Sequence, residues 1–234
     1  MFNLSPIEIE AIYLSMKISF WAVLVGLIPG VAAAYLLARK NFPGKLLLDG
    51  LIHVPLVIPP VVTGYILLIT FNDNAPMGKL LISIFGSGIA FSWKGAVVAS
   101  VVMSMPLLVR SVRLSIESID RGLEEAAKTL GAKRWRVFLT VTLPLSVPGI
   151  ITGTVLAFAR SLGEFGATIT FVSNIPGETR TLPVALYNLT QTPGTEAAAL
   201  RLCLISIGLS IAAIAASEYL SRRAALRLRG AVNA

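Results

Sequence analysis

The sequence contains little charge. Asp, Glu, Lys and Arg make up 14% of its 234 residues, whereas the hydrophobic residue types make up 55%. An average soluble domain has about 25% charged residues, so this composition excludes an ordinary soluble domain. The apolar residues also fall in uncharged blocks of about 20 residues, the length that crosses a bilayer as a helix. We therefore predict an all-α, polytopic membrane protein.

Residues that carry covalent or metal chemistry are scarce. Cys203 is the single cysteine and His53 the single histidine, so neither an intrachain disulfide nor a cysteine metal cluster can form. The sequence has no G-x-x-x-x-G-K-S/T loop for ATP phosphates and no H-E-x-x-H motif. We expect no catalytic residue, no cofactor and no metal site, and any ATP hydrolysis must belong to another chain. His53 is close to Pro55 and is expected to pack against neighbours or to face water rather than to act as a ligand.

The N-terminus lacks the features of a cleaved signal peptide. Glu8 and Glu10 stand where a signal peptide carries Lys or Arg, and no A-x-A cleavage site follows the apolar stretch. We therefore expect the first apolar block to remain in the protein as a helix.

Five blocks are long enough to cross a hydrocarbon core of about 30 Å at about 1.5 Å per helical residue. The expected spans, which form one transmembrane domain over residues 1–234, are residues 18–38, 50–71, 93–113, 145–172 and 197–220. Residues 80–92 leave two alternatives: an interfacial or re-entrant piece before the third span, which we favour, or a sixth short membrane element. In the fourth span, Gly163 and Gly166 would allow the helix to bend or break.

The Lys and Arg residues are unevenly distributed between the two sides of the membrane. The first connection, the third connection and the C-terminal tail carry three, seven and four of them, whereas the opposite side carries five. Short cytoplasmic loops carry the excess of basic residues, so we predict an external N-terminus and a cytoplasmic C-terminus in the cytoplasmic (inner) membrane. This topology accounts for the net charge of +8, and no nucleic-acid partner is expected.

The third connection, residues 114–144, is too long for a simple turn and has the pattern of a helix. Asp120 is a suitable N-cap, and Glu124 places negative charge in the first turn. Gly131 stands where a helix C-terminus favours a left-handed residue. These signals predict a short helix over residues 121–130.

The predicted loop helix carries a single apolar stripe. Its apolar residues are spaced as i, i+3, i+4 and i+7 and are Leu123, Ala126, Ala127 and Leu130. A second short amphipathic segment follows and presents Trp135, Phe138 and Leu139. The pattern alone fits a helix that lies on lipid headgroups or one that docks onto a cytosolic partner.

The same loop resembles the EAA loop of ATP-binding cassette (ABC) importer permeases. The resemblance rests on Glu125-Ala126-Ala127, three residues, Gly131, nine residues, and Val141-Thr142-Leu143-Pro144. The family more often has Ile where Val141 stands. The resemblance implies the type I permease fold, in which this loop forms a coupling helix that inserts into a cleft on an ATPase subunit. The coupling residues that it implies are Glu125, Ala126, Ala127, Gly131, Leu143 and Pro144.

Two further segments are similar to the molybdate permeases within that family: residues 161–168 (SLGEFGAT) and residues 176–183 (PGETRTLP). The resemblance implies an oxyanion, molybdate in the first place, that crosses by alternating access. The implied partners are cytosolic ABC ATPase subunits, a second copy of the permease and an external or periplasmic oxyanion-binding protein. Five spans cannot readily enclose a gated pathway, so two copies are expected to form the pore at a two-fold interface. Sulfate and tungstate remain alternative substrates, and a membrane assembly protein that binds a cytosolic partner without translocation remains an alternative function.

Arg160 and Glu164 are ionisable residues inside the fourth expected span. They are four residues apart and therefore share one helix face. Ionisable groups inside a membrane are costly, so they tend to pair with each other or to face a cavity. We favour a structural ion pair, with Arg160 on the pathway of an anion as the alternative.

Overall fold

The structure is a computed structural model that describes residues 4–232, with all side chains in that range except Phe85, Ser217 and residues 224–232. Within the described residues, all regular secondary structure is helical. Four helices in this range are long and apolar enough to cross a membrane, and a bent pair would make a fifth span. The predicted all-α membrane fold is confirmed.

The first long helix, α1 (Pro6–Arg39), begins well before residue 18, where the first expected span starts. Its start is fixed by a capping box: the Ser5 hydroxyl accepts from the Glu8 amide, and the Glu8 carboxylate accepts from the Ser5 amide. This box satisfies two amides that the first helical turn leaves free. The helix ends at Arg39, and Lys40 is already extended.

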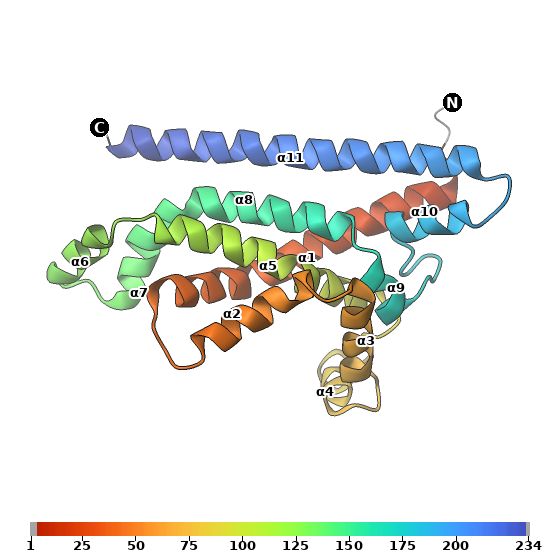
Figure 1. Ribbon diagram of the computed structural model, residues 1–234, viewed down its shortest axis with the longest axis horizontal. Coiled ribbons are helices and arrows are strands. Elements are labelled where there is room, and N and C mark those ends of the chain that lie inside the picture. The colour runs from red at the N-terminus through yellow and green to blue at the C-terminus, as the bar shows by residue number, and fades with distance from the viewer. Residues whose placement is uncertain (1–3, 233–234) are drawn as a thin grey trace.

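The second expected span consists of two helices rather than one. Helix α2 (Lys45–His53) and helix α3 (Pro60–Phe71) are separated by a 3-10 turn over Val54–Leu56 and are bent by 114°. Proline lacks an amide hydrogen and clashes with the preceding helical turn, so Pro55, Pro59 and Pro60 account for the break. Figure 1 shows α3 leaving the helical bundle at a steep angle.

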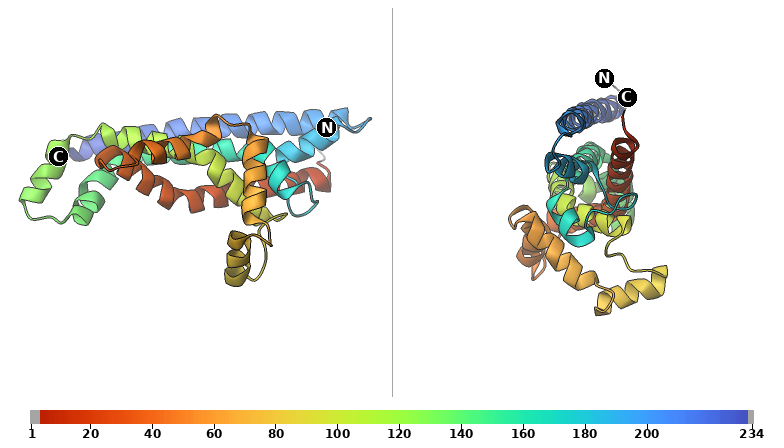
Figure 2. Two further views of the ribbon diagram at one scale, coloured as in Figure 1. Left: turned by 60° about the horizontal axis from the view of Figure 1, so that its bottom comes forward. Right: turned by 90° about the vertical axis from the view of Figure 1, so that its right-hand side faces the viewer.

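The stretch before the third span forms a short helix of its own. Helix α4 (Pro76–Phe85) has ten residues and projects from the bundle beyond α3 (Figures 1 and 2). Helix α5 (Trp93–Glu117) then begins where the third span was expected, because the Ser92 hydroxyl accepts from the Gly95 amide as an N-cap. A ten-residue helix of about 15 Å is too short to cross a bilayer.

The chain after residue 142 forms four helices. Helix α8 (Leu143–Leu162) ends directly before Gly163, and helix α9 (Gly166–Val172) begins at the other glycine of this pair. Helix α10 (Leu182–Thr190) and the long helix α11 (Glu196–Val232) complete the chain. Helix α11 packs along α8 (Figure 1), and most of its described side chains are exposed.

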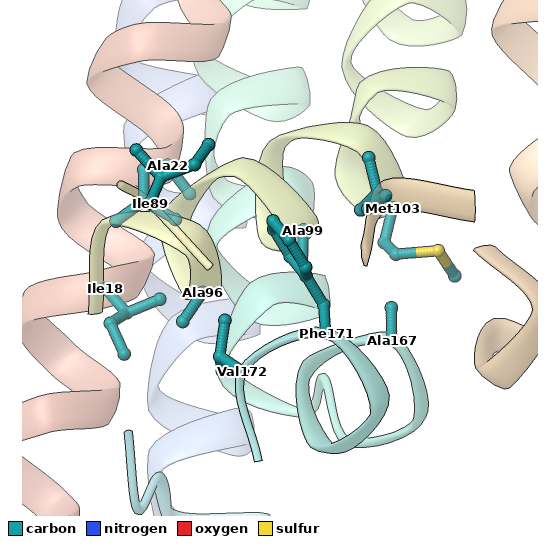
Figure 3. Packing of buried hydrophobic residues seen from close by; sticks show 11 residues of the cluster. Ile18, Ala22, Ile89, Ala96, Ala99, Met103, Ala167, Phe171 and Val172 are labelled. Carbon is teal, nitrogen blue, oxygen red and sulfur yellow. The ribbon is translucent and has the colours of Figure 1, made fainter. Parts of the chain in front are cut away.

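Helix α5 lies at the centre of the bundle, between α1 and α8 (Figure 2). Its buried side chains form two apolar clusters, one toward each end. Figure 3 shows one cluster, in which Phe171 and Val172 of α9 lie against Ala96 and Ala99 of α5. The small residues on α5 allow close helix packing, as is usual between membrane helices.

Candidate coupling site

Helix α6 (Arg121–Thr129) is the loop helix that the sequence predicts. The Asp120 carboxylate accepts from the Gly122 amide at 2.8 Å, so Asp120 is the N-cap. Gly131 follows the helix with a φ of +86°, the left-handed conformation that a C-cap glycine adopts at low cost. Both capping predictions are confirmed. Figure 1 shows α6 at the end of the molecule toward which α1 and α11 run.

Most of the apolar stripe of α6 is left uncovered by the described part of the chain. Leu123 is 52% exposed and Leu130 is 89% exposed. Ala126 is also exposed, and Ala127 is half-buried. Glu125 lies beside the stripe and is exposed. An exposed apolar stripe with two small residues at its centre is a surface that another protein or a lipid can contact closely.

Glu124, the residue directly before the EAA segment, is buried within the chain, unlike Glu125. Glu124 is buried, with 9% of its side chain exposed, and its Oε1 lies 3.0 Å from Nε of Arg39, whose side chain is 6% exposed. Arg39 also donates through Nη2 to the Ile119 carbonyl at 3.0 Å, and the Thr142 hydroxyl donates to Glu124 Oε1 at 2.9 Å. We call Arg39, Ile119, Glu124 and Thr142 the Glu124 cluster.

The Glu124 cluster connects three segments of the chain. Arg39 is the last residue of α1, Glu124 lies on α6, and Thr142 ends a π-helical turn, Phe138–Thr142, that leads directly into α8. A buried ion pair with further hydrogen bonds restricts the relative positions of the groups that carry it. From the sequence, Glu124 was predicted only to place negative charge in the first turn of the loop helix. Its partner was missed because 85 residues separate Arg39 from Glu124.

Leu143 and Pro144 lie apart from the EAA segment in the secondary structure. After α6, helix α7 (Arg134–Val137) runs into the π-helical turn, and α8 starts at Leu143 with Pro144 in its first turn. Pro144 has no amide hydrogen to donate to the preceding helical turn, which agrees with the irregular π-helical turn that stands directly before it. The six expected coupling residues are therefore divided between α6 with its cap and the start of α8.

Arg160 and Glu164 lie at the opposite end of α8, about 25 Å along the helix from Leu143. Arg160 Nη1 is 2.6 Å from Glu164 Oε2, and only 2% of the Glu164 side chain is exposed. The other carboxylate oxygen of Glu164 accepts from the Ala167 amide at 2.8 Å. Glu164 therefore binds both Arg160 and the first turn of α9, across the break between α8 and α9.

His53 lies in a separate polar group between α2 and α5. Its Nδ1 is 2.8 Å from the Asp49 carbonyl and 3.1 Å from Asp49 Oδ1, and Asp49 also pairs with Arg113 at 3.0 Å. The His53 side chain is 30% exposed. Among the described residues, no three His, Cys, Asp or Glu side chains are arranged to hold a metal ion.

A solved structure with the same arrangement of helices is a bacterial ABC transporter involved in the import of the acidic polysaccharide alginate. Its matching chain has a TM-score of 0.73 and 18% sequence identity, over 94% of this chain and 80% of that chain. At this identity the likeness concerns the fold alone. It confirms the predicted fold of a type I importer permease.

Sequence comparison identifies nearer relatives. The chain is 60% identical over 215 residues to the molybdenum transport system permease protein ModB of Escherichia coli K12, over 92% of this chain and 94% of that protein. It is 41% identical over 201 residues to the sulfate transport system permease protein CysW of Synechococcus elongatus, over 85% of this chain and 70% of that protein. Residues 26–226 match the family of binding-protein-dependent transport system inner membrane components. The chain belongs to this family and is a multi-pass component of the inner membrane.

Proposed function

We propose that this chain is the permease subunit of an ABC importer that carries molybdate across the inner membrane. The observation that carries the proposal is the identity of 60% to the E. coli molybdenum permease over 94% of that protein. The sulfate permease of S. elongatus is a more distant relative, so molybdate is preferred to sulfate. Tungstate is kept as the alternative substrate.

ATP hydrolysis is assigned to a separate ATPase subunit that docks on α6. The exposed stripe of α6 supports this assignment, because Leu123, Ala126 and Leu130 offer apolar surface that this chain does not cover. Ala127, at the centre of the stripe, leaves room for a partner backbone. The Glu124 cluster then transmits the displacement of α6 to α1 and to α8, since it is bonded to both.

The orientation proposed for the chain follows from this docking. The end of α11 lies at the α6 end of the molecule, and the start of α1 lies at the other end (Figure 1). If the ATPase binds α6 in the cytosol, the C-terminal end of α11 is cytoplasmic and the start of α1 is external. An external oxyanion-binding protein would deliver the anion at the opposite end, and a second copy of the chain would complete the pore.

Arg160 and Glu164 are assigned a structural role. Arg160 has a carboxylate oxygen at 2.6 Å, which leaves little net positive charge for a passing anion. Glu164 also caps the start of α9 through the Ala167 amide. Both contacts support a pair that stabilises the break between α8 and α9.

Uptake by proteoliposomes tests the proposed function. The chain is purified from its own cells with the proteins that accompany it and reconstituted with the anion-binding protein and radiolabelled molybdate. We expect an ATPase to co-purify and molybdate to accumulate only when ATP is supplied. An ATPase without uptake would support the assembly-protein alternative, and uptake that excess sulfate abolishes would move the substrate to sulfate.

A further inference from the structure

An apolar groove of about 630 Å³ opens between α1 and the segment that joins α7 to α8. Ile28, Val31 and Leu36 of α1 form one wall, and Phe138 and Ile150 belong to the other. The rings of Tyr35 and Phe138 meet edge to face at 4.8 Å and hold the two walls together. Tyr35, Lys40 and Arg134 of the lining also line a polar hollow beside α6, and apart from Trp135 the other lining residues are aliphatic or phenylalanine.

The groove has about the depth of one membrane leaflet. Its lining runs along α1 from Leu27 and Ile28 to Lys40. The 12 residues from Ile28 to Lys40 correspond to about 18 Å of helix at about 1.5 Å per residue. Half of a hydrocarbon core of about 30 Å is about 15 Å. Trp135 lies at the same end as Lys40 and is 63% exposed, as expected of a residue at the level of the headgroups.

The two cations at the rim have no acidic partner in the part of the chain that the structure describes. Arg39 is bound within the Glu124 cluster, but none of the ion pairs formed by the described side chains includes Lys40 or Arg134. An adjoining polar hollow continues the positive surface. Its lining includes five basic residues and two acidic ones, namely Arg39, Lys40, Arg121, Lys128 and Arg134 with Glu124 and Glu125.

We propose that this groove binds an anionic phospholipid of the cytoplasmic leaflet. One acyl chain lies along α1 in the groove, and the phosphate is held by Lys40 and Arg134. Basic pockets between membrane helices on the cytoplasmic side attract anionic headgroups, and a zwitterionic lipid with the same acyl chains lacks the net charge that these cations attract. The lipid would also reach the segment between α6 and α8, so the bilayer would contact the coupling site directly. The inference uses the orientation proposed above and does not depend on the transported anion.

Trp135 provides a direct reporter of an occupied groove. The other two tryptophans, Trp21 and Trp93, line a different pocket and are replaced by phenylalanine. The full-length protein is placed in nanodiscs of phosphatidylcholine that contain either brominated phosphatidylglycerol or brominated phosphatidylcholine. Bromine quenches tryptophan fluorescence on contact. Both leaflets of a nanodisc have the same composition, so the result does not depend on the orientation or on transport.

We expect brominated phosphatidylglycerol to quench Trp135 at a lower mole fraction than brominated phosphatidylcholine. The double variant Lys40→Gln/Arg134→Gln should weaken this preference at least about fivefold, since one basic group near an anionic surface contributes about that factor. The control Lys45→Gln/Arg136→Gln removes the same charge from residues of the same side that do not line the groove, and should keep the preference. Equal quenching by the two lipids, or equal loss in both double variants, would overturn the proposal. Absence of quenching by either lipid would overturn it as well, because a second copy or another protein would then cover the groove.

Discussion

Glu124 and Glu125 are adjacent residues with the same side chain and different surroundings. Glu125 is exposed, whereas Glu124 is buried against Arg39 and Thr142. The resemblance to importer permeases directs attention to Glu125, which starts the EAA segment. At the level of single residues, Glu125 is accessible to a partner protein, whereas Glu124 ties α6 to the end of α1 and to Thr142.

Replacing Glu124 by Gln should destabilise the protein and uncouple it. The substitution leaves the Arg39 guanidinium buried without a countercharge, which typically costs about 3 kcal/mol or more. We expect a lower Tm of the purified transporter and less uptake per ATP hydrolysed. Thermal unfolding and an uptake assay on the same sample measure the two effects.

Two controls separate burial from charge. Glu125→Gln removes the same charge one residue away and should leave the Tm unchanged, because Glu125 is exposed. Arg39→Met/Glu124→Met removes the pair as a whole and should recover most of the lost stability, as apolar replacement of buried pairs often does. If Glu125→Gln lowers the Tm as much as Glu124→Gln, the cluster does not hold α6.

The double variant in which Arg160 and Glu164 are exchanged should transport less than expected if the two residues formed only an ion pair. The exchange keeps one charge of each sign, but an arginine at position 164 cannot accept from the Ala167 amide. Glu164→Gln keeps an acceptor for that amide and loses only the charge, so it should be milder than Glu164→Leu. Molybdate uptake, measured with the variants that still assemble with the ATPase, ranks the three variants by their loss of function. A milder Glu164→Leu, or full rescue by the exchange, would show that the cap on α9 is unimportant.

Local sequence signals predict whole helices. Contacts between segments that are distant in the sequence could not be predicted in this way. The start and end of α6 follow from Asp120 and Gly131, because caps depend on residues within one helical turn. The early start of α1 was also encoded locally, in the Ser5 and Glu8 capping box, but apolar content alone placed the span later. The prolines of residues 55–60 signal the break between α2 and α3, but they do not specify its angle of 114°. The Arg39 contact with Glu124 joins elements 85 residues apart, and no local pattern pairs them.

Changes to the volume of α6 should uncouple ATP hydrolysis from transport. Ala127→Leu enlarges the centre of the exposed stripe and prevents close approach of a partner. Gly131→Val places a β-branched residue at a φ of +86°, where only glycine is unstrained. We expect ATPase activity that no longer responds to substrate, with membrane insertion unchanged. Lys128→Met, off the stripe, is the matched control, and full transport by Ala127→Leu would argue against docking on this face.

At the scale of the whole molecule, the helices divide the loops between two ends. Gly177 lies near the Glu10 side chain at the start of α1, since a Cβ on Gly177 would be 3.1 Å from Glu10 Oε1. Helix α6 and the far part of α11 lie at the other end (Figure 1). The side chains of the tail residues Arg227 and Arg229, which enter the count of basic residues, lie outside the described part.

Reporter fusions measure which end faces the cytoplasm. Fusions after Lys45, Arg136 and Gly230 should be active with a cytoplasmic reporter, and fusions after Asn74 and Gly177 with an external one, because the basic residues concentrate on the first side. A cytoplasmic signal after Gly177 would contradict the five-span topology.

The pairing of Glu8 with Arg201 sets an order of events during synthesis. Arg201 of α11 donates to both carboxylate oxygens of Glu8, at 3.1 and 3.3 Å, across 193 residues of sequence. A chain made from its N-terminus carries Glu8 through the insertion of every intervening helix before its arginine exists. Ser5, whose amide lies 2.6 Å from Glu8 Oε2, is a partner that is made together with it. Glu8 therefore gains its arginine only after synthesis has passed the beginning of α11, so we expect a chain truncated before Arg201 to keep an unneutralised acid at the start of α1.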